Sequence, residues 1–151
     1  MERRELSRRT IALCLAGGVG HALFALWLIG FVREGSFWGT NTPESPSGAA
    51  FLSVTILGLV LLGGVPFVLF FRYRLLSPFV ALFTLFTWAF YGSYQHFEEA
   101  RATGATPIGL YADSLFGILW FVPLAIVLLV GLVEYLVRSR FDSRPLEAPS
   151  D

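Results

Sequence analysis

Apolar residues form four long runs along the chain, separated by short stretches rich in glycine, proline and charged residues. A helix needs roughly 20 residues to cross the hydrocarbon core of a bilayer, because it rises about 1.5 Å per residue. The runs meet this length and cover about residues 10–32, 49–71, 78–96 and 114–137. The pattern predicts an all-α integral membrane protein with four transmembrane helices in an up-down bundle. We expect a single domain over residues 1–142 and a disordered tail over residues 143–151.

Composition agrees with a membrane protein and excludes some partners. Hydrophobic residues make up 55% of the 151 residues, charged residues make up 15%, and the mean hydropathy is +0.66. These values lie outside the ordinary range of soluble domains. A formal net charge of zero argues against a nucleic-acid partner, which requires a basic surface. The single cysteine, Cys14, excludes a disulfide within the chain. Membrane lipid is therefore the expected surrounding.

The arginines are distributed unevenly around the four runs. All eleven basic residues are arginines, and nine of them lie before the first run, between the second and third, or after the fourth. Arg33 and Arg101 lie on the other side. Basic residues concentrate on the cytoplasmic side of membrane proteins. The distribution predicts that both termini are cytoplasmic and that the protein resides in the cytoplasmic membrane of a bacterium or archaeon.

The third run has two different faces. At a helical advance of about 100° per residue, small and polar side chains share one stripe, and phenylalanines lie opposite. Towards the outside this stripe becomes aromatic and polar. We expect it to face the bundle and to line an outward-facing vestibule formed by Thr84, Trp88, Tyr91 and Gln95. The alternative is that these side chains fill the bundle interior and make ordinary hydrogen bonds between helices.

His21 lies near the middle of the first run and is the titratable side chain expected at the bilayer midplane. Such a group must face the bundle and find a partner. By depth, its expected neighbours are Thr84, Thr87, Trp88 and Tyr91. One interpretation is a proton-relay or cofactor-ligand histidine, with haem or quinone as the cofactor; the other is a neutral imidazole bonded to a hydroxyl or carbonyl. A haem held by His21 and His96 of one chain is not expected, because their depths differ by about 10 Å.

Small residues predict where helices approach each other closely. Ala12, Ala16 and Gly20 recur at four-residue spacing in the first run with Gly17 and Gly18 beside them, and Gly58 lies in the second. Such residues let helix backbones come into van der Waals contact within a membrane. We expect this face of the first run to contact another span of the chain or a second copy of it.

The ends of the runs carry capping and charge signals. Ser77-Pro78 is typical of a helix start, and Asp113-Ser114 resembles the N-cap of the fourth span. Thr103-Gly104 is expected to end the third helix. Asp113 and the two glutamates before it are expected to be solvated loop charges. Glu134 precedes Arg138 by four residues, the favourable order for an ion pair on a helix.

No nucleophile with its base, metal-ligating cluster or carboxylate pair is recognisable, so we do not expect an enzyme or a metal site. The first hypothesis is a non-enzymatic accessory or scaffold protein that packs through small-residue faces against another membrane protein or a second copy. The second is a transport or sensing protein that binds a small molecule, an ion, a quinone or a haem in the predicted vestibule. Replacing His21 and Gln95 by alanine would distinguish the two hypotheses.

Overall fold

The computed structural model describes residues 8–34, 46–104 and 111–142, and the regular elements within these ranges are all helices. The helices are α1 (Arg8–Glu34), α2 (Pro46–Tyr73), α3 (Ser77–Thr103), α4 (Ser114–Gly117) and α5 (Phe121–Asp142). The prediction of an all-α protein is confirmed for the described part of the chain. The predicted tail over residues 143–151 lies outside it.

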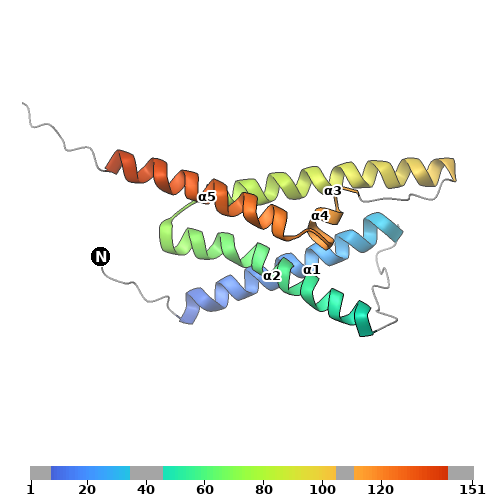
Figure 1. The fold of residues 1–151 in the computed structure, drawn as a ribbon, viewed down its shortest axis with the longest axis horizontal. Coiled ribbons are helices and arrows are strands. Elements are labelled where there is room, and N and C mark those ends of the chain that lie inside the picture. The colour runs from blue at the N-terminus through green and yellow to red at the C-terminus, as the bar shows by residue number, and fades with distance from the viewer. Residues whose placement is uncertain (1–7, 35–45, 105–110, 143–151) are drawn as a thin grey trace, which may run out of the picture.

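The four long helices pack as two pairs. α1 packs mainly against α2 and α3 mainly against α5, and a contact between α1 and α3 joins the pairs. Figure 1 shows that α1 begins, and α2 and α5 end, at the same end of the molecule. We call this the arginine-rich end, since Arg8, Arg9, Arg72, Arg74, Arg138 and Arg140 lie there. The opposite end carries Arg33 and Arg101.

Three helices are long and apolar enough to cross a membrane. They are α1 over Arg8–Arg33, α2 over Pro46–Tyr73 and α5 over Phe121–Phe141. This finding agrees with a membrane location. α3 has a comparable length of 27 residues but carries more polar and charged side chains, and it is not one of the three.

The fourth predicted span is interrupted. The prediction of one continuous helix over residues 114–137 is wrong, because the short helix α4 ends at Gly117 and α5 begins at Phe121. Pro123 gives the physical reason. Proline has no backbone N–H, and within a helix its ring clashes with the preceding turn. The break places Pro123 in the first turn of α5, where a helix has no such hydrogen bond to lose.

α2 supports the backbone at this break. The Thr55 hydroxyl donates a hydrogen bond of 3.0 Å to the carbonyl of Gly117. One turn along α2, the Trp120 side chain covers Gly58 so closely that a Cβ there would lie 2.1 Å from the indole ring. Non-helical backbone at membrane depth is tolerated where protein groups satisfy it. α2 therefore supplies both a hydrogen bond and a fitted surface for the break.

Glycines determine the contact between α1 and α2. A Cβ at Gly18 would lie 2.5 Å from the carbonyl oxygen of Val60, and one at Gly63 would lie 2.4 Å from the Cβ of His21. Cys14 is buried on the same face of α1. The two helices approach here because neither Gly18 nor Gly63 has a side chain to separate them.

The small-residue stripe predicted for the first run faces elsewhere. Ala12 and Ala16 are exposed, and no atom lies within 4 Å of the position of a Cβ at Gly20. The expectation that this stripe contacts another span of the same chain is therefore wrong. The part of the predicted small-residue face that does pack is Gly17 and Gly18, beside the stripe, because glycine allows a closer approach than alanine. A contact between this stripe and a second copy stays a prediction.

The two ends of α3 differ from each other in how they are capped. Gly104 follows the helix with φ of +68° and donates to the carbonyls of the last turn, so the predicted helix end is confirmed. The predicted cap at the other end is wrong, because Ser77 is the first helical residue and the preceding Leu76 makes no side-chain cap. Glu134 of α5 caps this end instead, through hydrogen bonds from the backbone nitrogens of Ser77 and Leu76.

Candidate functional site

The polar stripe of α3 lies on the outside of the structure. Trp88 is 62% exposed and Tyr91 is 63% exposed, and Thr84 and Gln95 are also exposed. Gln95 donates a hydrogen bond of 2.8 Å to the hydroxyl of Tyr91. The prediction that this stripe faces the bundle is wrong.

Phe86, Phe90 and Phe97, opposite the stripe on α3, are buried instead, whereas Phe83 is 73% exposed. Phe86 lies 4.4 Å from Phe90 and 5.1 Å from Phe116 between ring centroids, and Phe116 is fully buried. Phenylalanine buries a large apolar area without leaving a polar atom that needs a partner, whereas tryptophan and tyrosine each carry one. This difference favours phenylalanine for the contact with α4. The buried residues of α3 are Pro78, Leu82, Phe86, Ala89, Phe90, Ser93 and Phe97.

His21 lies among aromatic rings rather than among the predicted hydroxyls. Its ring centroid is 5.5 Å from that of Phe86 and 6.5 Å from that of Phe116. Its Nε2 atom is buried and has no hydrogen-bond partner in the described part of the chain. A cavity of about 320 Å³ lies beside it, lined by Gly17, Phe24, Gly63, Phe67, Phe79, Leu82, Phe83 and Phe86. The lining contains none of the four predicted neighbours, Thr84, Thr87, Trp88 and Tyr91, because all four are exposed on the outer side of α3.

A charged cluster at the opposite end joins three helices. The Nε atom of Arg33, at the end of α1, donates a hydrogen bond of 2.7 Å to a carboxylate oxygen of Asp113. The Ser93 hydroxyl of α3 donates to the other carboxylate oxygen at 3.0 Å and accepts a hydrogen bond of 2.9 Å from the backbone nitrogen of Asp113. Arg33 also donates to the hydroxyl of Ser114 at 3.2 Å. We call these four residues the Arg33–Asp113 cluster.

Asp113 is fully buried, with 0% of its surface exposed. Its predicted role as a solvated loop charge is wrong, and so is its predicted side-chain cap, because it makes no capping hydrogen bond to α4. A buried carboxylate is costly unless a cation and hydrogen-bond donors surround it. Arg33 supplies the cation, and its own side chain is 42% exposed. The cluster therefore pairs a buried carboxylate with a guanidinium group that is partly exposed at the surface.

A cavity of about 200 Å³ lies beside the Arg33–Asp113 cluster. α1, α2 and the break between α4 and α5 form its walls. Its polar groups come from Arg33, Thr55 and Asp113, and its remaining lining residues are Leu26, Ile29, Phe51, Leu52, Gly117 and Ile118. Within residues 8–34, 46–104 and 111–142, no group of three His, Cys, Asp or Glu side chains could hold a metal ion. The arrangement can bind a small polar group, and it also locks the helix ends together.

Arg101 strengthens the same end of the bundle. Its guanidinium donates a hydrogen bond of 2.6 Å to the carbonyl of Val32 and pairs with Glu98 on its own helix. Both arginines of the opposite end thus hold the end of α1. Neither contact was predicted from the sequence. The available signal was that two isolated arginines at one end of an apolar bundle need partners.

No protein-family model matches the chain, and comparison with curated proteins and with solved structures gave no match either.

Proposed function

We propose that the protein is a non-enzymatic integral membrane protein, an accessory or scaffold subunit that crosses the cytoplasmic membrane four times with both termini in the cytoplasm. The position of α3 supports the fourth crossing. Its first residue, Ser77, bonds to Glu134 of α5, and near its other end Arg101 bonds to Val32 of α1. Its 27 residues extend over about 40 Å, enough to cross beside α1, α2 and α5.

The exposed stripe of α3 carries the scaffold proposal. Trp88 lies near the middle of the helix, where its indole N–H would meet hydrocarbon. An N–H group without a hydrogen bond in hydrocarbon is costly, and Gln95 carries more donor and acceptor positions than its one bond to Tyr91 uses. A protein partner along this stripe would satisfy these groups. Association of helices within membranes relies on close packing and hydrogen bonds of this kind.

A second copy of the chain is the partner that the chemistry of the stripe favours. Thr84, Tyr91 and Gln95 can each donate and accept hydrogen bonds, and the stripe from Thr84 to Gln95 carries no formal charge. A two-fold symmetric interface brings the same patch against itself and so requires a patch that complements itself. An uncharged stripe of donors and acceptors meets this requirement.

Cysteine cross-linking in native membranes tests the proposal. Single cysteines are introduced at Thr84, Trp88 and Tyr91 in a Cys14→Ala background, and at Leu129 and Val133 as controls on α5. These controls are 60% and 59% exposed, comparable to Trp88 and Tyr91, but they lie in an apolar surface. Oxidation should give dimers through the stripe positions and not through the controls. Cross-linking to a protein of another mass would support an accessory role with a different partner, and no cross-link from the stripe would overturn the scaffold proposal.

Binding of a small molecule is a second candidate function, and His21 favours it. Its Nε2 atom lacks a hydrogen bond beside a cavity with aromatic walls. A flat ring bearing a carbonyl or hydroxyl group, such as a quinone, would suit both features. In this case a quinone should raise the melting temperature of the wild type and of Gln95→Ala, whose side chain lies outside this cavity, but not of His21→Ala. No shift with the wild type would remove this candidate.

A further inference from the structure

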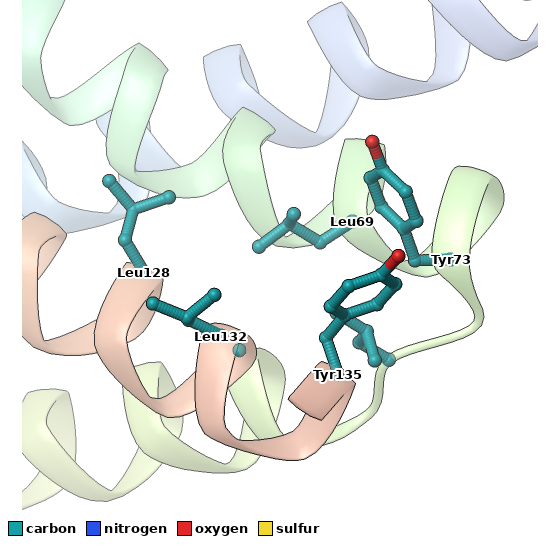
Figure 2. Close-up of a pocket in the computed structure, with 7 residues that line it drawn as sticks. Leu69, Tyr73, Leu128, Leu132 and Tyr135 are labelled. Atoms are coloured by element: carbon teal, nitrogen blue, oxygen red, sulfur yellow. The ribbon is translucent and has the colours of Figure 1, made fainter. Parts of the chain in front are cut away.

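A second apolar cavity opens between α2 and α5 at the arginine-rich end. Its volume is about 360 Å³. Figure 2 shows Leu128 and Leu132 of α5 on one side and Leu69 of α2 on the other. Gly131 contributes a stretch of bare backbone to the lining. The cavity lies between α2 and α5, two of the helices that can cross a membrane, so we expect a hydrocarbon chain to occupy it.

Two tyrosines line one end of this cavity, and an arginine contacts one of them. Tyr73 and Tyr135 pack edge to face with ring centroids 5.6 Å apart, as Figure 2 shows side by side. The guanidinium of Arg72 lies 5.6 Å from the centroid of the Tyr73 ring, and its Nε atom donates a hydrogen bond of 3.2 Å to the Tyr73 hydroxyl. Within the described part of the chain the terminal nitrogens of Arg72 make no hydrogen bond, so they are available as donors.

Further arginines surround the same end. Arg138 lies one turn beyond Tyr135, is 50% exposed, and donates a hydrogen bond of 2.9 Å to the carbonyl of Arg74. Glu134 is the acidic residue nearby, and it is already engaged by Arg138 and by the N-terminus of α3. Arg72, Arg74 and Arg138 thus lie at this end of the helices, and Glu134 pairs with Arg138 alone, which leaves a net positive charge beside an apolar cavity.

We propose that this cavity binds one anionic phospholipid, with an acyl chain along the leucines and the phosphate on Arg72 and Arg138. Leucines line the cavity, tyrosines line its end, and the arginines lie beside the tyrosines; this order matches the order of groups in such a lipid, from acyl chain to phosphate. Tyrosine and arginine suit the headgroup level of a membrane, and guanidinium groups bind phosphate through paired hydrogen bonds. Basic pockets between transmembrane helices bind anionic headgroups on the same principle.

Lipid titration of the purified full chain tests the charge part of the proposal. The protein is delipidated in detergent, phosphatidylglycerol or phosphatidylcholine is added, and bound lipid is counted by native mass spectrometry. The wild type should bind phosphatidylglycerol more tightly. Arg72→Gln should weaken this binding about fivefold, the change expected for one arginine at a membrane surface, and should leave phosphatidylcholine binding unchanged. Arg9→Gln, an exposed arginine at the same end but on α1, is the matched control.

A second pair of variants tests the acyl-chain part. Leu132→Trp should fill the cavity and reduce the retention of both lipids at this site. Leu129→Trp makes the same change on the same helix at an exposed position outside the lining and should bind lipid like the wild type. Inorganic phosphate, which lacks the chain, should not displace phosphatidylglycerol at equal concentration. Equal retention of the two lipids by the wild type, equal effects of Arg72→Gln and Arg9→Gln, or wild-type binding by a folded Leu132→Trp would overturn the proposal.

Discussion

The carboxylate of Glu134 in α5 accepts a hydrogen bond of 2.9 Å from the backbone nitrogen of Ser77 and so caps the N-terminus of α3. The backbone nitrogen of Leu76 donates a second bond of 3.4 Å to the same side chain. The first N–H groups of a helix have no partner within it, and their positive partial charge favours an anion. Arg138, which pairs with Glu134, also bonds to the carbonyl of Arg74. α5 thereby fixes the turn between α2 and α3.

Glu134→Ala should destabilise the protein more than Arg138→Ala does. The first change removes the cap and should lower the free energy of unfolding by about 1.5 kcal/mol, within the range of cap losses. The second removes a half-exposed ion pair, which contributes less than about 1 kcal/mol. Reversible unfolding in mixed detergent measures both changes. Equal losses would mean that the ion pair, rather than the cap, provides the stabilisation.

Arg33→Gln should cost more stability than Asp113→Asn. The first variant leaves a fully buried carboxylate without its cation and should lower the free energy of unfolding by about 3 kcal/mol. The second leaves a neutral amide that can still accept a hydrogen bond from Ser93, while the partly exposed Arg33 can turn towards the headgroups. We expect its cost to be about 1 kcal/mol. The same unfolding measurement applies, and the reverse order would contradict the role assigned to Arg33.

The sequence predicted the helices well, because apolar runs of membrane length determine them without reference to neighbours. The end of α3 at Gly104 and the pair of Glu134 with Arg138 were also predictable, since both depend on residues within one helix. The break before α5 depends on more distant groups. Pro123 signals that a break is possible, but Thr55 and Gly58 of α2 are the residues that accommodate it.

The inner face of α3 could not be predicted, because both faces of this helix are apolar enough for either environment. Phe86 and Trp88 differ little in hydrophobic character. In a membrane the outer face of a helix meets hydrocarbon and not water, so hydrophobicity does not indicate which of the two residues is buried. The Arg33–Asp113 cluster could not be predicted for a different reason. Arg33 and Asp113 are 80 positions apart, and Glu98 and Glu99 were equally good candidates to pair with an arginine of that end.

Gly58→Ala should destabilise the protein, whereas Gly20→Ala should not. A Cβ at Gly58 would lie 2.1 Å from the ring of Trp120, so the indole must move and the fit between α2 and the break is lost. The expected cost is about 2 kcal/mol, typical of overpacking. At Gly20 no atom lies within 4 Å of the new Cβ, and alanine has the higher helix propensity. Both free energies of unfolding are measured in detergent, and equal effects would contradict the close packing at Gly58.

Thr55→Val tests whether the hydroxyl of α2 stabilises the break between α4 and α5. Valine keeps the shape of threonine but removes the donor to the carbonyl of Gly117, which lies 3.0 Å from the hydroxyl. Because Thr55 is 5% exposed, water cannot readily replace this bond, and the free energy of unfolding should fall by about 1–2 kcal/mol. Ser53→Ala is the control, since its exposed hydroxyl bonds to the carbonyl of Ala49 within α2. Hydrogen exchange at the amides of Ile118 and Leu119 should increase in Thr55→Val alone. Unchanged exchange there would show that the break is held without Thr55.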